Sequence, residues 1–360
     1  MMDRRHKWAA VAAVGALSVL VGVVGAVADD GDDDVRQNAF TVALWGDTPY
    51  SATEVSKLPA LIADINAAKV AFSVFDGDIK SGSSQCTNEV FAAAIQRFGT
   101  FRSPMVYVPG DNEWTDCHRI NNGSYNTLER LSFLRQTMFA EERSFGQTTL
   151  LLEHQGPLGG VYAENTRWTY GDVVFLGLNV PGSNNNKVGS GFTPTDCVFP
   201  APPALPKTLR TQLDCDADNV EYQARDAANI AWLHDSFELA KSRGLKGLMV
   251  VIQADMSFDL PETENFNERL HGPGFDIDGY DNFIAALIAE TKAFTGQVVL
   301  VHGDIHFFKV DKILADQAHL IPNFTRVETF GSPNVHWVKA TIDPRSRNLF
   351  RFEPMIVPGN

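Results

Sequence analysis

The sequence predicts an α/β fold in which several parallel strands end at one edge of a sheet. Three observations predict it. Short, continuous apolar runs recur along the chain, and such runs are typical of strands that are buried on both faces. Stretches with helical periodicity lie between them. Five of the runs lead directly into a turn that carries an aspartate, most often as Gly-Asp.

The predicted strands occupy residues 40–44, 70–75, 105–108, 172–178, 248–252 and 298–301. Helices are predicted at 53–68 and 224–243, and Gly244 is expected to end the second helix as its C-terminal cap. Alternating strands and helices imply right-handed crossovers, which bring the carboxyl ends of the strands to one edge. Open α/β sheets bind their ligands at that edge.

Residues 1–28 are predicted to be a signal peptide. Basic residues near the start precede an uncharged apolar run at 8–27, and small residues lead up to Asp29. A retained membrane anchor is the alternative, because the run is long for a signal peptide. The acidic segment 29–37 is predicted to be a flexible tether to a single domain at 38–356. The protein is therefore expected to be secreted or periplasmic, with no stable membrane association after cleavage.

The chain of 360 residues carries a net charge of −14, and removal of residues 1–28, with one aspartate and three basic residues, makes it −16. Such an acidic protein is not expected to bind nucleic acid by general electrostatics. The four cysteines predict two disulfides in an exported protein. Their sequence proximity favours Cys86–Cys117 and Cys197–Cys215. Residues 146–218, rich in Asn, Pro, Gly and Ser, are expected to be a long loop-rich insertion.

The aspartates after the strands are expected to hold metal ions. Asp47, Asp78, Asp111 and Asp304 should point into one crevice, where clustered carboxylates repel one another unless a cation binds them. His306 adds an imidazole. Two divalent ions that share a carboxylate would clamp a phosphate and activate water. Turn formation alone also explains a single aspartate of this kind, but it is a weaker explanation for four strand ends.

The order of these blocks resembles that of the calcineurin-like metallophosphoesterases. That family has D-x-H, G-D, G-N-H-E/D, a lone His and G-H-x-H in sequence order. The corresponding residues here are Asp47-Thr48-Pro49, Gly77-Asp78, Gly110-Asp111-Asn112-Glu113, Gln253 and Gly303-Asp304-Ile305-His306. The resemblance covers residues 40–310 and implies a four-layer α/β/β/α sandwich of two mixed β-sheets flanked by helices.

The resemblance also implies roles for these residues. Asp47 and His306 would hold the first metal and Asp78 would bridge both. The second metal would be held by Asp111, Gln253 and Asp304, although Asp255 is a rival for the position of Gln253.

Two departures from the family pattern change the expected chemistry. Pro49 replaces a histidine ligand, and Asn112 replaces the histidine that usually protonates the leaving group. A site with one imidazole and many oxygens favours Mn²⁺, Mg²⁺ or Ca²⁺ over Zn²⁺. The candidate catalytic residues are then Asn112, Glu113 and His118, although His118 is at least as consistent with a structural histidine.

Further candidates for substrate binding are Asn112, Lys80, Asn334 and His336, with ordinary structural roles as the alternative for the last three. The resemblance implies hydrolysis of a small-molecule phosphate ester by metal-activated hydroxide. A catalytically degenerate relative that binds metal or phosphate, and a metal-dependent hydrolase of a non-phosphate bond, are the alternatives. The sequence does not identify the substrate or the oligomeric state.

Overall fold

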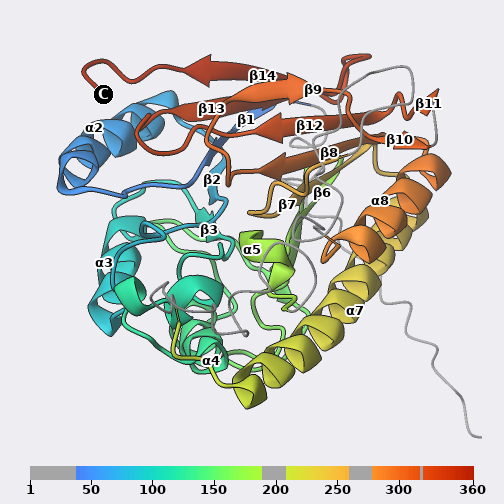
Figure 1. Cartoon of the computed structure of the whole chain (residues 1–360). Helices are drawn as coiled ribbons and strands as arrows, with labels where there is room; N and C mark the ends of the chain where they lie inside the picture. The colour runs from blue at the N-terminus through green and yellow to red at the C-terminus, as the bar shows by residue number, and fades with distance from the viewer. Residues whose placement is uncertain (1–37, 189–207, 259–277, 317–318) are drawn as a thin grey trace, which may run out of the picture.

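The computed structural model describes residues 38–188, 208–258, 278–316 and 319–360. Two mixed β-sheets pack face to face, and helices cover their outer faces (Figure 1). The predicted four-layer α/β/β/α architecture is therefore confirmed. The predicted signal peptide (1–28) and tether (29–37) lie outside the described residues.

Within the described residues, no helix combines the length and apolar character needed to cross a membrane.

The first sheet has five strands. In spatial order they are β14 (Phe350–Met355), β13 (Trp337–Ile342), β1 (Phe40–Trp45), β2 (Phe72–Phe75) and β3 (Met105–Tyr107). The strands β1, β2 and β3 run parallel, whereas β13 and β14 add in antiparallel fashion. The three parallel strands are those predicted from the apolar runs, and their carboxyl ends share one edge.

The second sheet has seven strands. In spatial order they are β4 (Glu153–His154), β5 (Thr166–Tyr170), β6 (Val173–Gly177), β7 (Gly247–Val251), β8 (Gln297–His302), β12 (Phe324–Glu328) and β9 (Lys309–Asp311). The strands from β6 to β12 are parallel. A short ribbon of β10 (Ala315–Asp316) and β11 (His319–Leu320) lies apart from both sheets. The segment 146–218, expected to be rich in loops, thus also contributes β4, β5 and β6 to this sheet.

Three helices cover the first sheet: α2 (Ala52–Ala68), α3 (Asn88–Phe98) and α4 (Thr127–Met138). The helix α2 starts one residue before its predicted start, because Ser51 caps it by accepting a hydrogen bond from the backbone N–H of Glu54. Its buried face carries Leu58, Leu61 and Ile65. Two short 3₁₀ turns, η1 (Thr115–His118) and η2 (Ile120–Asn122), follow β3.

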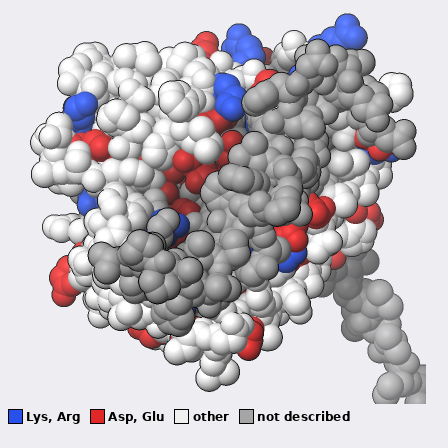
Figure 2. Space-filling view, in the orientation of Figure 1, with Lys and Arg blue, Asp and Glu red and all other residues white. Residues whose placement is uncertain are grey.

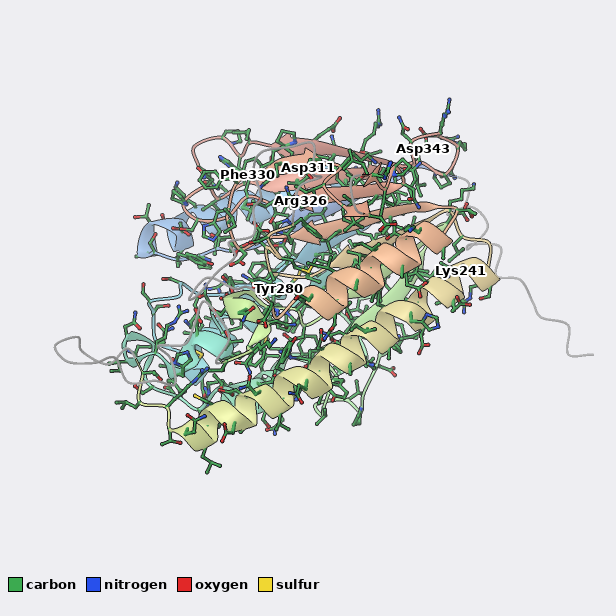
Figure 3. All side chains as sticks on the ribbon, turned by 45° about the vertical axis from the view of Figure 1, so that its right-hand side comes forward. Lys241, Tyr280, Asp311, Arg326, Phe330 and Asp343 are labelled. Atoms are coloured by element: carbon green, nitrogen blue, oxygen red, sulfur yellow. A yellow bond between two sulfur atoms is a disulfide. The ribbon has the colours of Figure 1, made fainter. Side chains whose placement is uncertain are left out.

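Two helices cover the second sheet and lie side by side (Figure 3): α7 (Gln212–Ser242) and α8 (Asp281–Ala293). The predicted helix 224–243 is the C-terminal part of α7. The helix begins earlier because Thr211 and Asp214 form a capping box, in which each side chain accepts the other residue's backbone N–H. Gly244 follows the helix with a φ of 64°, in the left-handed region expected for a C-terminal glycine.

The core between the two sheets follows from alternation along the strands. In β1, Val42 and Leu44 pack between the sheets, whereas Ala43 and Trp45 pack outward against helices. The strand β7 alternates in the same way on the other side. Because both faces of each central strand are buried, the strands are largely apolar, although β2 contains the buried Ser73 and β12 the buried Arg326 and Glu328. The predicted aspartate ligands first appear in the turns after the strands.

One predicted disulfide is confirmed. Cys86 and Cys117, 31 residues apart in sequence, are bonded. This bond joins the loop after β2 to η1, the turn that follows β3. The bond thereby ties together the segments that follow two neighbouring strands of the first sheet. Cys215 lies on α7, but its predicted partner, Cys197, lies outside the described residues.

Candidate functional site

The turns after the central strands of both sheets meet at one edge of the molecule. Asp47 follows β1, Asp78 follows β2, Asp111 follows β3 and Asp304 follows β8. The first three side chains are buried and Asp304 is half-buried. Acidic atoms gather in a hollow on this face of the molecule (Figure 2). The structure therefore brings these four predicted ligands together.

The Gly-Asp pattern has a steric cause at this edge. A Cβ atom on Gly303 would lie 1.8 Å from Asp47 Oδ2, and one on Gly110 would lie 2.1 Å from Asp78 Oδ1. In each case the glycine of one turn makes room for the carboxylate of another. Glycine is thus required here by the close approach of neighbouring turns.

Several of the predicted ligands have strained backbones. Asp47, Asp78, Asp304 and His306 have φ values of 46°, 66°, 76° and 74°. Left-handed conformations cost non-glycine residues about 1 kcal/mol or more each, and they concentrate at functional sites. These four residues lie in the turns directly after β1, β2 and β8.

His306 presents a nitrogen suited to binding a metal. Its Nδ1 lies 2.8 Å from the backbone oxygen of Ser332, which can only accept, so Nδ1 carries the hydrogen. Its Nε2 lies 3.5 Å from Asp47 Oδ1. Burial would lower the pKa of His306, but Asp47 outweighs burial and raises it. A bound cation would replace the proton on Nε2 and use the same orientation of the ring.

Asp78 is surrounded by neutral hydrogen-bond donors. The Tyr50 hydroxyl lies 2.5 Å from Asp78 Oδ2 and 3.3 Å from Asp47 Oδ1. The backbone N–H of Asn112 donates to Asp78 Oδ1 at 3.1 Å, and its side-chain amide donates to Asp78 Oδ2. Tyr50 and Asn112 therefore line the space next to the residue expected to bridge two metals.

Gln253 faces the carboxylates with its amide nitrogen. Its Oε1 accepts from the backbone N–H of Gly182 at 2.5 Å, which orients the amide. Its Nε2 lies 3.3 Å from Asp111 Oδ1 and 3.4 Å from Asp304 Oδ1. An amide nitrogen is a donor and does not bind a cation. Gln253 therefore joins Asp111 to Asp304 by hydrogen bonds in this structure, whereas its predicted role requires the opposite orientation.

A left-handed turn covers the other side of Asp111. In α5 (Gly182–Asn185) the residues 183–185, and Asn186 after them, have φ values of 50–59°. The Ser183 hydroxyl lies 2.8 Å from Asp111 Oδ2 and 2.7 Å from Asp116 Oδ1. Tyr280, labelled in Figure 3, supports the turn by donating to the backbone oxygen of Pro181 at 3.0 Å.

The electrostatics favour occupation by a cation. Burial, followed by the charges of Asp111 and Asp47, raises the pKa of both Asp78 and Asp304 well above the ordinary value. Burial and Asp111 raise the pKa of Asp116 to about 7. In the described part of the chain, the one ion pair found for the four predicted aspartate ligands is that with His306. The raised pKa values of Asp78 and Asp304 favour the protonated form of these two carboxyls unless a cation binds them.

The donor set fits a divalent cation that prefers oxygen ligands, because it combines four carboxylates with one imidazole. In the described part of the chain, no three of these potential metal ligands have ligand atoms that all lie within 4.8 Å of one another. Among the described residues, the one group of three potential ligands whose atoms all lie within 4.8 Å of one another is His234, Glu238 and Glu290 on the surface. Lys241 forms ion pairs with both of those glutamates.

A cleft of about 430 Å³ opens over the carboxylates, a size that suits a small molecule. It combines predicted ligands with residues that the sequence did not single out. Its lining consists of Tyr50, Asp78, Gly82, Asp111, Asn112, Asp116, Arg119, Ser183, Asn184, Asp255, Ser257, Tyr280, Asp304, Ile305 and His306.

Two predicted catalytic residues do not line this cleft. His118 is buried, and its Nδ1 lies 2.9 Å from the Thr208 hydroxyl. Burial, together with Arg210, lowers the pKa of His118 to about 2, so the ring is neutral. Glu113 is fully buried, and its Oε1 accepts hydrogen bonds from the Tyr107 hydroxyl at 2.7 Å and from the backbone N–H of Gly110 at 2.8 Å. Both residues are placed to support the loop after β3.

Three predicted substrate-binding residues are also outside the cleft lining. Lys80 is buried and donates to the backbone oxygen of Ser81 at 2.8 Å. Asn334 continues a turn that starts at Gly331, and His336 Nδ1 accepts from the backbone N–H of Val357 at 3.4 Å. The geometry therefore gives these three residues structural contacts, and of the predicted substrate-binding residues only Asn112 lines the cleft.

The sequence analysis missed Tyr50, Ser183 and Arg119 as residues of this cleft. Tyr50 lies three positions after Asp47, so its nearness to a predicted ligand was a usable signal. Ser183 and Arg119 carry no local signal. Ser183 reaches the cleft through its contacts with Asp111 and Asp116, and Arg119, between η1 and η2, contacts Ser183 there.

Comparisons with known proteins support no family assignment. No family model matches the chain, and no curated protein matches it. Among solved structures, the chain is similar to a dimetal phosphatase from Danio rerio, with 10% identity, a TM-score of 0.46, and coverage of 88% of this chain and 99% of the other.

Two further structures give the same TM-score of 0.46 at 11% identity. The chain is similar to PhoD, with coverage of 85% of this chain and 64% of that one. It is also similar to a purple acid phosphatase from yellow lupin seeds, with 86% of this chain and 50% of that one covered. Because identity and TM-score are this low, the reaction and the ligands of this chain have to be argued from its own residues.

Proposed function

We propose that the protein is an exported, metal-dependent phosphoesterase that acts on small phosphate esters. One observation carries the proposal. Asp78, Asp111 and Asp304, from separate strand ends, line one cleft with His306, and the fully buried Asp47 lies 3.5 Å from His306 Nε2. That contact is the only ion pair of the four aspartates among the described residues. Burying several like charges is costly unless cations or protons neutralise them. Bound divalent cations would neutralise these charges and would also supply the chemistry of phosphate ester hydrolysis.

The proposed roles follow from position. Asp47 and His306 would hold one cation, Asp78 would lie between two, and Asp111 with Asp304 would hold the other. Bound divalent cations would polarise the phosphoryl group and lower the pKa of water. Asn112 lines the cleft with a side-chain amide that can donate to a phosphate oxygen. The Tyr50 hydroxyl is a second donor beside Asp78.

The cleft favours substrates with good leaving groups. The two residues considered as acids, His118 and Glu113, are held by other contacts outside the cleft lining. Aryl phosphates and phosphoanhydrides need little protonation of the leaving group. The oxygen-rich ligand set supports Mn²⁺, Mg²⁺ or Ca²⁺ as the cation in preference to Zn²⁺.

Export is supported by the apolar segment 8–27 and by the disulfide between Cys86 and Cys117. Mass spectrometry of the protein from its native cells tests it. A mature chain that starts at Asp29 in the soluble extracellular or periplasmic fraction is expected. Recovery of a membrane-bound chain that keeps residues 1–28 would show that this segment is a retained anchor and would contradict cleavage of a signal peptide.

The activity is tested with residues 29–360 and aryl phosphate mono- and diesters. Hydrolysis is measured after chelation and with Mn²⁺, Mg²⁺, Ca²⁺ or Zn²⁺, with Asp78→Asn as the matched variant. Metal-dependent turnover that falls by at least about 100-fold in Asp78→Asn is expected, because the variant removes the carboxylate shared by both sites. Turnover that survives chelation would contradict the proposal.

The second candidate function is a binding protein that keeps the cleft without catalysis. The orientation of Gln253 favours it, because the amide nitrogen already neutralises part of the charge of Asp111 and Asp304 through hydrogen bonds. A folded protein that binds metal but hydrolyses none of the phosphate esters would support this candidate. A wider panel of esters and amides would then distinguish it from a hydrolase of a non-phosphate bond.

A further inference from the structure

Arg119 is the one Lys or Arg residue that lines the cleft in the described part of the chain. The other ionisable lining residues are aspartates, His306 and two tyrosines. The side chain of Arg119 is 33% exposed, whereas the nearby Lys80 is buried and does not line the cleft. An anion that enters the cleft therefore meets one permanently positive side chain.

The guanidinium of Arg119 is held from two sides. Its Nη1 forms an ion pair with Asp116, whose side chain is buried. Its Nη2 donates to the Ser183 hydroxyl at 3.3 Å, and that hydroxyl also lies 2.7 Å from Asp116 Oδ1. Because η1 and α5 contribute to this arrangement, Arg119 is oriented before any ligand arrives, which lowers the entropic cost of binding.

The space beside Arg119 is left open by a glycine. A Cβ atom on Gly82 would lie 2.6 Å from Asn112 Oδ1 and 3.6 Å from Arg119 Nη1. All three residues line the cleft. A side chain at position 82 would therefore fill the gap between the amide and the guanidinium. With glycine there, the gap is open to a ligand atom that both groups can reach.

A purely structural ion pair is the simpler explanation of Arg119, because Asp116 and Arg119 are only three residues apart. However, the two contacts use two of the five N–H groups of the guanidinium. Arginine binds phosphate through several N–H groups at once, and its charge does not change with pH in the physiological range. Arg119 is partly exposed in an otherwise acidic cleft, so its remaining N–H groups can reach a bound phosphate.

We propose that Arg119 is a substrate-binding residue that selects phosphate monoesters over diesters. The proposal rests on the proposed phosphoesterase function. A monoester has three non-bridging oxygens and up to two negative charges, whereas a diester has two such oxygens and one charge. Cations held by the aspartates would attract the phosphoryl group. Arg119 binds the additional anionic oxygen, which a diester replaces by an esterified one.

The test compares kcat/KM for an aryl phosphate monoester and the matching diester in one metal. The variants are Arg119→Gln, Arg119→Lys and, as a control, Arg143→Gln at an exposed arginine. Arg119→Gln should lower kcat/KM for the monoester by about 10- to 100-fold and for the diester by less than about 3-fold. Arg119→Lys should recover part of the loss, because it keeps a charge beside Asp116.

Equal losses for both substrates, or no loss for either, would overturn the selectivity of Arg119 while leaving the phosphoesterase intact. If the wild-type protein hydrolyses neither substrate, the proposed function fails, and calorimetric titration of inorganic phosphate into the Mn²⁺-loaded protein decides the binding role. Binding that weakens by at least about 10-fold in Arg119→Gln but not in Arg143→Gln supports phosphate recognition. Unchanged or absent binding in the wild-type protein and variant overturns it.

Discussion

At the scale of single residues, the site depends on glycines that leave room for carboxylates. Gly303, Gly110 and Gly46 each lie so close to an aspartate of another turn that a Cβ atom would come within 2.1 Å of it. The glycine of one turn thus accommodates an aspartate of another turn: Gly303 accommodates Asp47, Gly110 accommodates Asp78 and Gly46 accommodates Asp76. Substitution of Gly303 or Gly110 should therefore displace a predicted metal-binding aspartate without removing its carboxylate.

Gly303→Ala tests this relation. The new methyl group would displace Asp47, so we expect metal-dependent turnover to fall by about 100-fold. The free energy of unfolding should fall by about 1–3 kcal/mol from overpacking. Activity assays and denaturant unfolding measure the two effects. Gly99→Ala is the matched control, because a Cβ there meets its nearest atom at an ordinary 3.5 Å; equal effects of both variants would refute the steric explanation.

His118 gives the opposite expectation. Because its ring contacts Thr208 and does not line the cleft, His118→Ala should leave kcat within about 3-fold of the wild-type value. The free energy of unfolding should fall by about 1–2 kcal/mol, since a buried hydrogen bond is lost. Asn112→Ala, which changes a residue of the cleft, should lower kcat in the same assay. A large loss of kcat in His118→Ala would restore this histidine as a candidate acid.

At the scale of structural elements, the loops after β2 and β3 carry most of the first sheet's contribution to the site. The Cys86–Cys117 bond ties them together, and both sulfur atoms lie near the backbone oxygen of Asn112, at 3.5 and 3.6 Å. The bond therefore restrains Asn112, which in turn donates to Asp78. A disulfide that is remote from the reacting groups thus supports their arrangement.

Replacement of both cysteines by serine tests this restraint. Loss of a cross-link between residues 31 apart should lower the free energy of unfolding by about 3–4 kcal/mol. We also expect a lower affinity for Mn²⁺, measured by calorimetry, because the two loops are less well ordered. Leu61→Ala in the buried face of α2 should cost a similar 2–5 kcal/mol, roughly, without this loss of affinity. Equal metal affinities would limit the disulfide to a stabilising role.

At the scale of the whole molecule, the acidic cluster makes stability depend on pH and on cations together. The folded-state pKa values of Asp78 and Asp304 are raised, and that of Asp116 is about 7. The folded protein therefore holds protons that the unfolded chain releases near the ordinary carboxyl pKa of about 4. In the absence of metal, the contribution of these carboxyls to the free energy of unfolding is therefore largest near pH 4 and declines as the pH rises toward 7.

Thermal unfolding between pH 5 and 8 measures this linkage. In the presence of a chelator, the Tm should fall as the pH increases through this range. Saturating Mn²⁺ should raise the Tm, and the increase should be larger at pH 8 than at pH 5, because protons compete with the cation. Asp304→Asn should flatten the metal-free profile by removing one of the carboxyls. A metal-free Tm that rises with pH would contradict the assignment of raised pKa values.

The sequence by itself determines the features of this protein that depend on short stretches of chain. Continuous apolar runs followed by Gly-Asp predict the parallel strands and the aspartates after them, and Cys86 and Cys117 pair as their sequence proximity indicated. These features depend on short stretches of chain, where strand periodicity and turn chemistry act. The helix α2 followed in the same way from its periodic apolar face.

The tertiary structure decided which side chains face the cleft. The orientation of the Gln253 amide depends on the backbone N–H of Gly182, and Ser183 reaches Asp111 from a turn far away in sequence. Arg119 joins the cleft, while His118, its immediate neighbour, turns toward Thr208. Such choices arise from long-range packing, because distant segments must first meet before a side chain has a partner. Composition and spacing along the chain therefore contain no signal for them.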